Sequence, residues 1–194
     1  MLPRMSAALR RPMTVAEFLD WEAARERPSE FDGFAPVAMV GVTRAHAAIQ
    51  RNLTIAVGTR LRGKPCRFYG PEIQVRPPGT VRYPDGVVTC TPGGPRDRVL
   101  DAPVVLFEIL SESTAATDRT DKAREYRAIP SVRRYVMLAQ DRAAAEMHVR
   151  DGDRWLSVLL FEGDVLDMPE IGVAVPMAEL YEEVEFPPRE AEAG

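Results

Sequence analysis

The sequence predicts an α+β protein with a mixed central β-sheet, flanked by helices and carrying extra β-hairpins. Two helical segments come first, a series of short strand-like segments follows, and one helical segment stands between two strongly apolar strands. With 194 residues, 45% of them hydrophobic and 28% charged, the chain is long enough for one domain with a buried core. We expect that domain to span 13–186, with a flexible N-terminal extension at 1–12 and a disordered tail at 187–194.

The first part of the domain predicts two helices around a hairpin. The segment 14–26 begins with the capping-box spacing, in which Thr14 stands three residues before Glu17. The segment 29–40 predicts two short strands around an Asp-Gly turn. A helix is expected over 43–61, because its apolar residues recur at helical spacing.

The second part of the domain predicts mainly strands. Short extended runs are separated by Pro and Gly, and the run Val-Val-Leu-Phe-Glu-Ile-Leu has the apolar character of a central strand. A helix N-capped by Asp118 or Thr117 would link this strand to the next by a strand-helix-strand crossover. The elements expected here are strands at 66–75, 81–90, 103–110 and 134–139, a helix at about 118–128, a hairpin at 146–160 and a terminal helix at 177–184.

Composition and charge exclude several classes of function. The net charge of −4 argues against indiscriminate binding to polyanions, so any contact with nucleic acid should be local. The chain has no run of 18 apolar residues, and its first 13 residues lack the apolar stretch of a secretory signal, so we expect a cytoplasmic protein. Cys66 and Cys90 are too few for a disulfide framework, and with two scattered histidines they show no zinc-ligand spacing.

Three residues carry the candidate chemistry. Glu108 lies inside the apolar strand, where a carboxylate loses hydration unless a cation compensates it. Asp85 lies between Pro84 and Gly86, just before a short β-branched run. Lysine occurs only twice among 25 basic residues, and Lys122 would lean from the helix after 103–110 back toward Glu108.

Each of these residues also has a purely structural interpretation. Glu108 could form an ion pair with an arginine, Asp85 could be a turn residue, and Lys122 could be a solvated helix lysine. Taken together, two carboxylates and a lysine favour a site for a hard cation, Mg²⁺ or Mn²⁺. Such a site suits metal-assisted hydrolysis of a phosphodiester.

The same residues carry a family resemblance. The order of Pro84 and Asp85, then a glutamate in an apolar strand, then a lysine resembles the PD-(D/E)xK nuclease superfamily. More specifically, the chain resembles the bacterial Uma-type family of restriction-endonuclease-like proteins over about 13–140, and more weakly as far as Tyr181. The matching stretches are MTVAEFL, the Glu-x-Asp-Gly at 30–33, His46, YPDGVV, VLFEILSEST, DRTDKAREY and IPSVRRYVMLAQD.

The resemblance implies a restriction-endonuclease-like core and a set of site residues. Asp85, Glu108 and the main-chain carbonyl of Ile109 would hold the metal, and Glu30 would complete the site. The superfamily pattern would place lysine at 110, where this chain has leucine, and Lys122 matches the lysine that this family carries on the next helix. Two positions depart from the family: Gly86 stands where valine is common, and Glu112 where proline often lies.

Further residues are weaker candidates for contacts with the substrate. Gln74, Ser111 and Ser113 could face the site, although capping of a helix is the commoner role of such serines. His46 is more often a local polar contact than a general base. Arginines near the predicted catalytic helix could meet phosphates, and so could a second basic group, although pairing with acidic residues is the commoner role. The two groups are Arg119, Arg124, Arg127, Arg133 and Arg134, and Arg60, Arg62, Lys64 and Arg67.

These observations favour a divalent-metal-dependent endonuclease acting on DNA. Cleavage of both strands would need two sites, so we expect a homodimer. A nuclease-like fold that only binds nucleic acid or regulates is the alternative, and a small-nucleotide phosphoesterase is a third. No segment resembles a base-reading helix, so the sequence predicts no cleavage site, and a restriction role rests on analogy.

Overall fold

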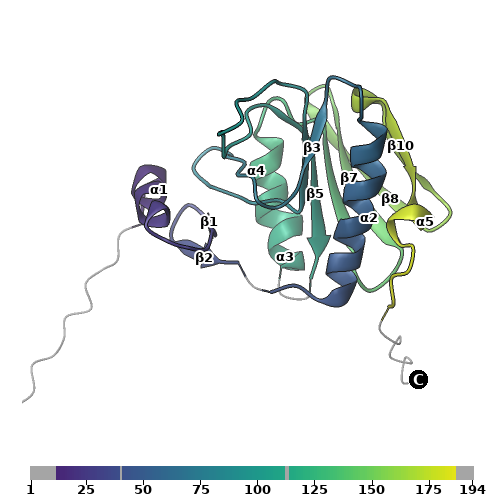
Figure 1. Cartoon of the computed structure of the whole chain (residues 1–194), viewed down its shortest axis with the longest axis horizontal. Coiled ribbons are helices and arrows are strands. Elements are labelled where there is room, and N and C mark those ends of the chain that lie inside the picture. Colours follow the sequence, from purple (N-terminus) through teal and green to yellow (C-terminus); the bar gives the residue numbers. More distant parts are fainter. Residues whose placement is uncertain (1–11, 40, 112–113, 187–194) are drawn as a thin grey trace, which may run out of the picture.

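A computed structural model describes residues 12–39, 41–111 and 114–186, and its centre is a six-stranded sheet with the order β3-β4-β5-β6-β7-β8 (Figure 1). β5 and β6 run parallel, and every other neighbouring pair in this sheet is antiparallel. The predicted mixed sheet is therefore confirmed. Its strands are β3 (Arg67–Tyr69), β4 (Gly86–Thr89), β5 (Pro103–Leu110), β6 (Arg134–Ala139), β7 (Ala144–Asp151) and β8 (Arg154–Phe161).

Helices cover both faces of the sheet. α2 (Arg44–Arg60) packs on one face, and the continuous helix formed by α3 (Ala115–Thr117), η1 (Asp118–Lys122) and α4 (Ala123–Arg127) packs on the other. This second helix connects β5 to the parallel β6, which is the predicted crossover.

The two ends of the domain add smaller elements. α1 (Val15–Ala23) and the antiparallel pair of β1 (Ser29–Phe31) and β2 (Pro36–Ala38) lie to one side of the main sheet (Figure 1). The capping box at Thr14 is formed, with the Thr14 hydroxyl and the Glu17 side chain bonded to each other's backbone N–H groups. At the other end, β9 (Val165–Met168), η2 (Pro169–Ile171), β10 (Val173–Pro176) and α5 (Met177–Leu180) join the apolar cluster around α2.

The alternation of side chains along β5 separates the core from the site. Phe107 and Ile109 enter the apolar cluster under α2, whereas Leu106 and Leu110 enter the cluster under α4. Because successive side chains of a strand point to opposite faces, Glu108 lies on the α4 face. The strand that builds the core under α2 therefore also carries a carboxylate to the opposite face.

The helix after β5 differs from the prediction. It begins at Ala115 instead of near Asp118, and neither Thr117 nor Asp118 caps it, because both have helical backbone angles. The five residues of η1 form a π-helical turn, in which the N–H of Ala123 bonds to the carbonyl of Asp118. Such wide turns are rare and are frequently found at functional sites. Propensity patterns do not encode them, so the sequence could not indicate this one.

Other predicted elements are shorter in the structure. The terminal helix ends at Leu180 instead of 184, and the strand expected over 66–75 is limited to β3 and two isolated bridges at Gln74 and Val75. A disulfide bond joins Cys66 to Cys90, beside the paired Arg67 and Thr89 of β3 and β4. The sequence does not predict this single bond, because only the fold brings the two cysteines together. Within the described ranges, no helix is long and apolar enough to cross a membrane.

Candidate active site

The Pro84-Asp85 pair lies where β4 meets the end of β5. The antiparallel ladder of β4 and β5 ends at Gly86 and Phe107, so Pro84 and Asp85 lie just before β4, beside the end of β5 that carries Glu108 and Ile109. The Asp85 carboxylate bonds to the backbone N–H of Ile109, and its charge helps to raise the pKa of Glu108. Asp85 and Glu108, distant in the sequence, are therefore close together in the fold.

Asp85 is held by one of its two carboxylate oxygens. Oδ2 accepts the backbone N–H of Ile109 at 2.7 Å and lies 3.3 Å from Nε2 of His46 at the start of α2. Among the described residues, no hydrogen bond or ion pair reaches Oδ1. One oxygen of this carboxylate is thus available to a ligand.

Pro84 affects the hydrogen bonding of the Ile109 backbone carbonyl. In a strand, the N–H and C=O of one residue point to the same side, and here that side faces Asp85. Pro84, which precedes Asp85, has no N–H to offer. The carbonyl of Ile109 therefore receives no ladder hydrogen bond from position 84, which gives a physical reason for a proline before the aspartate.

Glu108 is buried, with only 4% of its surface exposed. Its Oε1 accepts the Tyr126 hydroxyl at 2.9 Å and the Lys122 ammonium at 3.1 Å. Oε2 has no partner among the described residues. Like Asp85, this carboxylate is oriented through one oxygen while the other stays available.

Lys122 occupies the centre of a group of carboxylates. Its Nζ lies 3.1 Å from Glu108, 3.1 Å from Oε1 of Glu30 and 3.3 Å from Oδ1 of Asp118. Asp118 is one turn before Lys122 in η1, and its side chain is 1% exposed. The π-helical turn therefore brings an acid and a base of one helix onto the acid of β5.

A second cation links the hairpin to the helix. Arg82 is 2% exposed and makes a bidentate pair with Glu125 of α4, at 2.7 and 2.8 Å. Its Nη1 bonds to Oε2 of Glu30 at 3.1 Å, and the backbone N–H of Tyr83 donates to the other Glu30 oxygen. Glu30 of β1 is thus fixed between Arg82 and Lys122.

The whole group carries an excess of negative charge. Five carboxylates, those of Glu30, Asp85, Glu108, Asp118 and Glu125, face two permanent cations, those of Arg82 and Lys122. His46 would offset at most one of the three surplus charges. Burying uncompensated charge is costly, so this arrangement favours either proton uptake or a bound cation.

The pKa values reflect this excess. Burial raises the pKa of Glu108 well above its ordinary value; Lys122 opposes the rise, while Asp85, Asp118 and Glu30 add to it. Burial alone would lower the pKa of Lys122, but the carboxylates of Glu108, Glu30 and Asp118 outweigh it, so the pKa is raised. Burial also raises the pKa of Asp118. Lys122 therefore stays an ammonium at neutral pH, and Glu108 readily takes up a proton.

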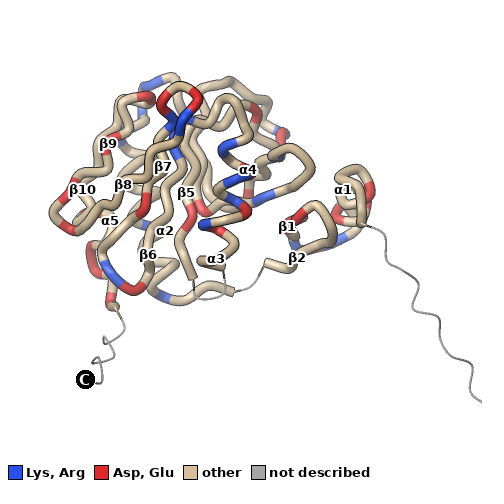
Figure 2. Tube along the Cα trace, turned by 180° about the vertical axis from the view of Figure 1, so that it is seen from behind, with Lys and Arg blue, Asp and Glu red and all other residues tan. Residues whose placement is uncertain are grey.

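A cleft of about 360 Å³ opens beside this group. It lies between the β1–β2 hairpin and the α3–η1–α4 helix, where Figure 2 shows acidic and basic positions close together. Residues of both walls line it: Glu30, Asp32, Val37, Arg82, Thr114, Thr117, Asp118, Asp121, Lys122, Arg124 and Glu125. Lys122 and its partners Glu30 and Asp118 thus line one cleft, whereas Asp85 and Glu108 lie outside its lining.

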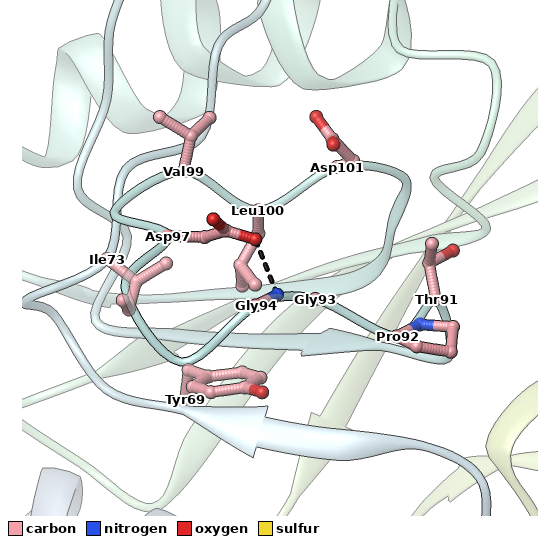
Figure 3. A pocket seen from close by; sticks show the side chains of 10 residues that line it. All are labelled: Tyr69, Ile73, Thr91, Pro92, Gly93, Gly94, Asp97, Val99, Leu100 and Asp101. Carbon is pink, nitrogen blue, oxygen red and sulfur yellow. Dashed lines mark hydrogen bonds between the residues drawn. The ribbon is translucent and has the colours of Figure 1, made fainter.

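A second, smaller pocket has no connection with this chemistry. It measures about 70 Å³ and is enclosed by the loop 91–101, with Tyr69 of β3 on one side (Figure 3). Its carboxylate Asp97 already accepts the backbone N–H of Gly94 at 2.6 Å. The loop uses Asp97 to hold its own turn.

The weaker candidates are mostly engaged elsewhere. Gln74 donates to Glu22 and Tyr83, away from Lys122. Ser111 exchanges hydrogen bonds with Thr114, the residue just before the helix. Ser113 lies outside the described residues.

The basic residues near the helix are divided between the interior and the surface. Arg134 forms a bidentate pair with Glu170, and Arg127 contacts His148. Arg119 lies 3.5 Å from Glu146, and Arg124 pairs with Asp121 at the exposed mouth of the cleft. In the second group, Arg60 pairs with Glu179 and Lys64 with the carbonyl of Gly172. Of the basic residues in these two groups, Arg124 lines the cleft.

A divalent cation fits part of this donor set. Within the described residues, no three His, Cys, Asp or Glu side chains converge as a ready-made metal centre. The groups still able to accept a hard cation are Oδ1 of Asp85, just before β4, and Oε2 of Glu108 and the carbonyl of Ile109 on β5. These are oxygen ligands, and Mg²⁺ commonly binds through one or two carboxylates and completes its coordination with water.

Three residues of the site were missed from the sequence. Asp118 was interpreted only as a helix cap, although its spacing from Lys122 is that of an i,i+4 ion pair. Tyr126 is not among the candidates from the sequence, yet its hydroxyl orients Glu108. Arg82 lies 43 residues from Glu125, and nothing local in the sequence indicates that pair.

Comparison with known proteins places the chain in a family. The Uma2 family, described as "Putative restriction endonuclease", matches residues 15–178. The chain belongs to the Uma2 family. A relative from Synechocystis, an uncharacterized protein, is 30% identical over 178 residues, covering 88% of this chain and 92% of the relative. A second uncharacterized Synechocystis protein is 25% identical over 158 residues, covering 78% of this chain and 89% of its own length.

A solved structure shares the fold. The crystal structure of a protein from Anabaena variabilis, titled a putative nuclease belonging to DUF820, superposes with a TM-score of 0.73. It covers 88% of this chain and 98% of the other, at 16% identity. The predicted restriction-endonuclease-like family and the α+β fold class are therefore confirmed for this Uma2 protein.

Proposed function

We propose that this Uma2 protein is a divalent-metal-dependent endonuclease that hydrolyses phosphodiester bonds of DNA. The observation that carries the proposal is the meeting of Asp85 and Glu108 at the end of β5, where Asp85 accepts the backbone N–H of Ile109 and Lys122 lies 3.1 Å from Glu108. Family membership and the nuclease title of the Anabaena protein support the general reaction. The metal and the DNA substrate are our inference from the donor set.

Asp85, Glu108 and the Ile109 carbonyl would hold Mg²⁺ or Mn²⁺. When bound, the cation would polarise a phosphoryl oxygen and lower the pKa of water. Asp85 is oriented for this by Ile109 and His46, and Glu108 by Tyr126 and Lys122. Each ligand thus keeps one oxygen fixed and presents the other.

Lys122 would act by its charge. Because its pKa is raised, it cannot take a proton at neutral pH, so it is no general base. An ammonium held by Glu108, Glu30 and Asp118 can orient a water or stabilise charge that develops on the phosphate. Glu30 and Asp118 act through Lys122 as positioning residues.

The decisive experiment is nicking of supercoiled plasmid with Mg²⁺ or Mn²⁺. Wild-type protein should nick, EDTA should stop it, and Asp85→Asn and Lys122→Met should each lower the rate by about 100-fold or more. Asp153→Asn, at an exposed turn between β7 and β8, is the matched control and should nick normally. Equal nicking by all four proteins would indicate a contaminant and refute the proposal.

Metal binding can be measured without catalysis. A cation that binds only the folded protein raises its melting temperature. Mn²⁺ should therefore raise the melting temperature of the wild type and of Asp153→Asn, but much less that of Asp85→Asn. An equal rise in all three would place the cation elsewhere.

A second candidate is a nuclease-like module that binds nucleic acid without cutting it. The observation that favours it is that, within the described residues, no three metal-ligating side chains converge as a metal centre. Retention of DNA with no nicking at any metal concentration would support this module. If the endonuclease cuts both strands, two copies have to act together, so we include a homodimer in the proposal.

A further inference from the structure

The two edges of the central sheet differ sharply. β3 is three residues long and begins with Arg67, whereas β8 is eight residues long. β8 pairs with β7 over its whole length, and no described strand lies on its other side, since β9 and β10 pair with each other. The outer backbone groups of β8 are thus left without a strand partner.

The side chains of β8 are unusual for a free edge. Proteins normally protect such edges with charged residues, prolines or bulges. The run from Trp155 to Phe161 reads Trp-Leu-Ser-Val-Leu-Leu-Phe, with no charge and no proline, and its register with β7 is regular. Leu159 and Phe161 are 63% and 58% exposed, and Leu156 is 50% exposed.

Both faces of this strand are apolar at the edge. Leu159 and Phe161 alternate with Leu156 and Val158, so the two pairs lie on opposite faces. A strand that completes this edge has to offer apolar side chains on both of its faces. β8 of a second copy is such a strand.

Two charges at the ends of β8 indicate how two copies would align. Arg154 begins the strand and Glu162 follows its last residue, both are exposed, and neither has an ion pair among the described residues. In an antiparallel pair centred on Val158, Arg154 lies opposite Glu162 of the second copy, twice by symmetry. The same register places Trp155 opposite Phe161, and Leu156 opposite Leu160.

We propose that β8 is a self-association surface, at which two copies of the chain pair antiparallel, edge to edge, about a two-fold axis at Val158. One strand pair buries less than the roughly 800 Å² per partner of a standard interface, so the dimer should be reversible, with a Kd on the order of micromolar. The proposal does not depend on the nuclease reaction.

The first test compares substitutions at two exposed aliphatic residues in the full chain. Leu159→Lys places a charge on β8, and Ile55→Lys, at 58% exposure on α2, is the matched control. Sedimentation over a concentration series should show a monomer–dimer equilibrium for wild type and Ile55→Lys, and a Kd at least tenfold weaker for Leu159→Lys. Because both side chains are exposed, both variants should keep the wild-type melting temperature at low concentration.

The second test checks the register. Arg154→Glu and Glu162→Arg should each weaken the dimer several-fold, because like charges then face each other. The double variant should restore wild-type association. Three results would each overturn the proposal. The wild type could stay monomeric at protein concentrations up to 100-fold above the expected micromolar range. The Kd of Leu159→Lys could equal that of the wild type, or the double variant could associate as weakly as the single variants.

Discussion

The two faces of the central sheet are built from the same strands but carry different kinds of side chain. Under α2, the sheet presents apolar side chains such as Phe107 and Ile109, which pack in the larger cluster. Under α4, the same strand presents Glu108, held by Lys122 and Tyr126 and surrounded by other acids. Both faces contribute apolar packing, but the second also keeps a buried charge excess that opposes folding.

The difference between the faces shows why the site can be costly without unfolding the protein. The apolar face and the ordered crossover hold β5 in place whatever the charge state of Glu108. Carboxylates that are strained by mutual repulsion are therefore tolerated beside a well-packed core, as is common at functional sites. Adjacent residues of β5 should respond to mutation in opposite directions.

The largest effect is expected on the apolar face. Phe107→Ala removes a fully buried ring that contacts Phe68, and it should lower the free energy of unfolding by about 3–5 kcal/mol. Urea denaturation monitored by circular dichroism measures this change. A loss below about 1 kcal/mol would mean that this face is not the main source of stability.

A smaller and opposite effect is expected one residue away. The raised pKa of Glu108 means that the folded state binds its proton more tightly than the unfolded state, so stability falls as pH rises above the unfolded value of about 4.3. Glu108→Gln removes that loss and keeps an oxygen acceptor for Lys122 and Tyr126. In EDTA, its melting temperature at pH 8 should exceed that of wild type by a few degrees.

The pH dependence of this difference is the sharper measurement. The advantage of Glu108→Gln should be full above the raised pKa of Glu108 and should vanish as pH is lowered toward about 4. Tyr126→Phe, which removes the hydroxyl on Oε1, should leave the carboxylate less well solvated and enlarge the loss at high pH. If Glu108→Gln were less stable than wild type at pH 8, the buried charge excess would not be destabilising.

The smallest effect on stability is expected at the mouth of the cleft. Arg124 pairs with Asp121 in an exposed position, so Arg124→Ala should change the free energy of unfolding by about 0.5 kcal/mol or less. If Arg124 contacts a phosphate, the slope of log K against log salt for DNA binding should fall by about one unit. An unchanged slope would remove Arg124 from the substrate contacts.

Much of the site was visible in the sequence because its signals are local. A carboxylate within an apolar strand and a proline before Asp85 are features of short segments, and each segment forms its element largely by itself. The exact bounds of β5 and β6 follow for the same reason, since strongly apolar runs have one stable arrangement in a buried sheet. The family resemblance placed Lys122 and Glu30 beside them.

What only the tertiary structure decided depends on contacts between distant segments. The sequence by itself determined the fold class, the crossover and the acids at 85 and 108. Packing of the helix against β5 decided the π-helical turn that brings Asp118 and Lys122 to Glu108, and the hairpin's approach decided the pairing of Arg82 with Glu30 and Glu125. Ion pairs of this kind form only when burial removes competing water, and burial is a property of the whole fold.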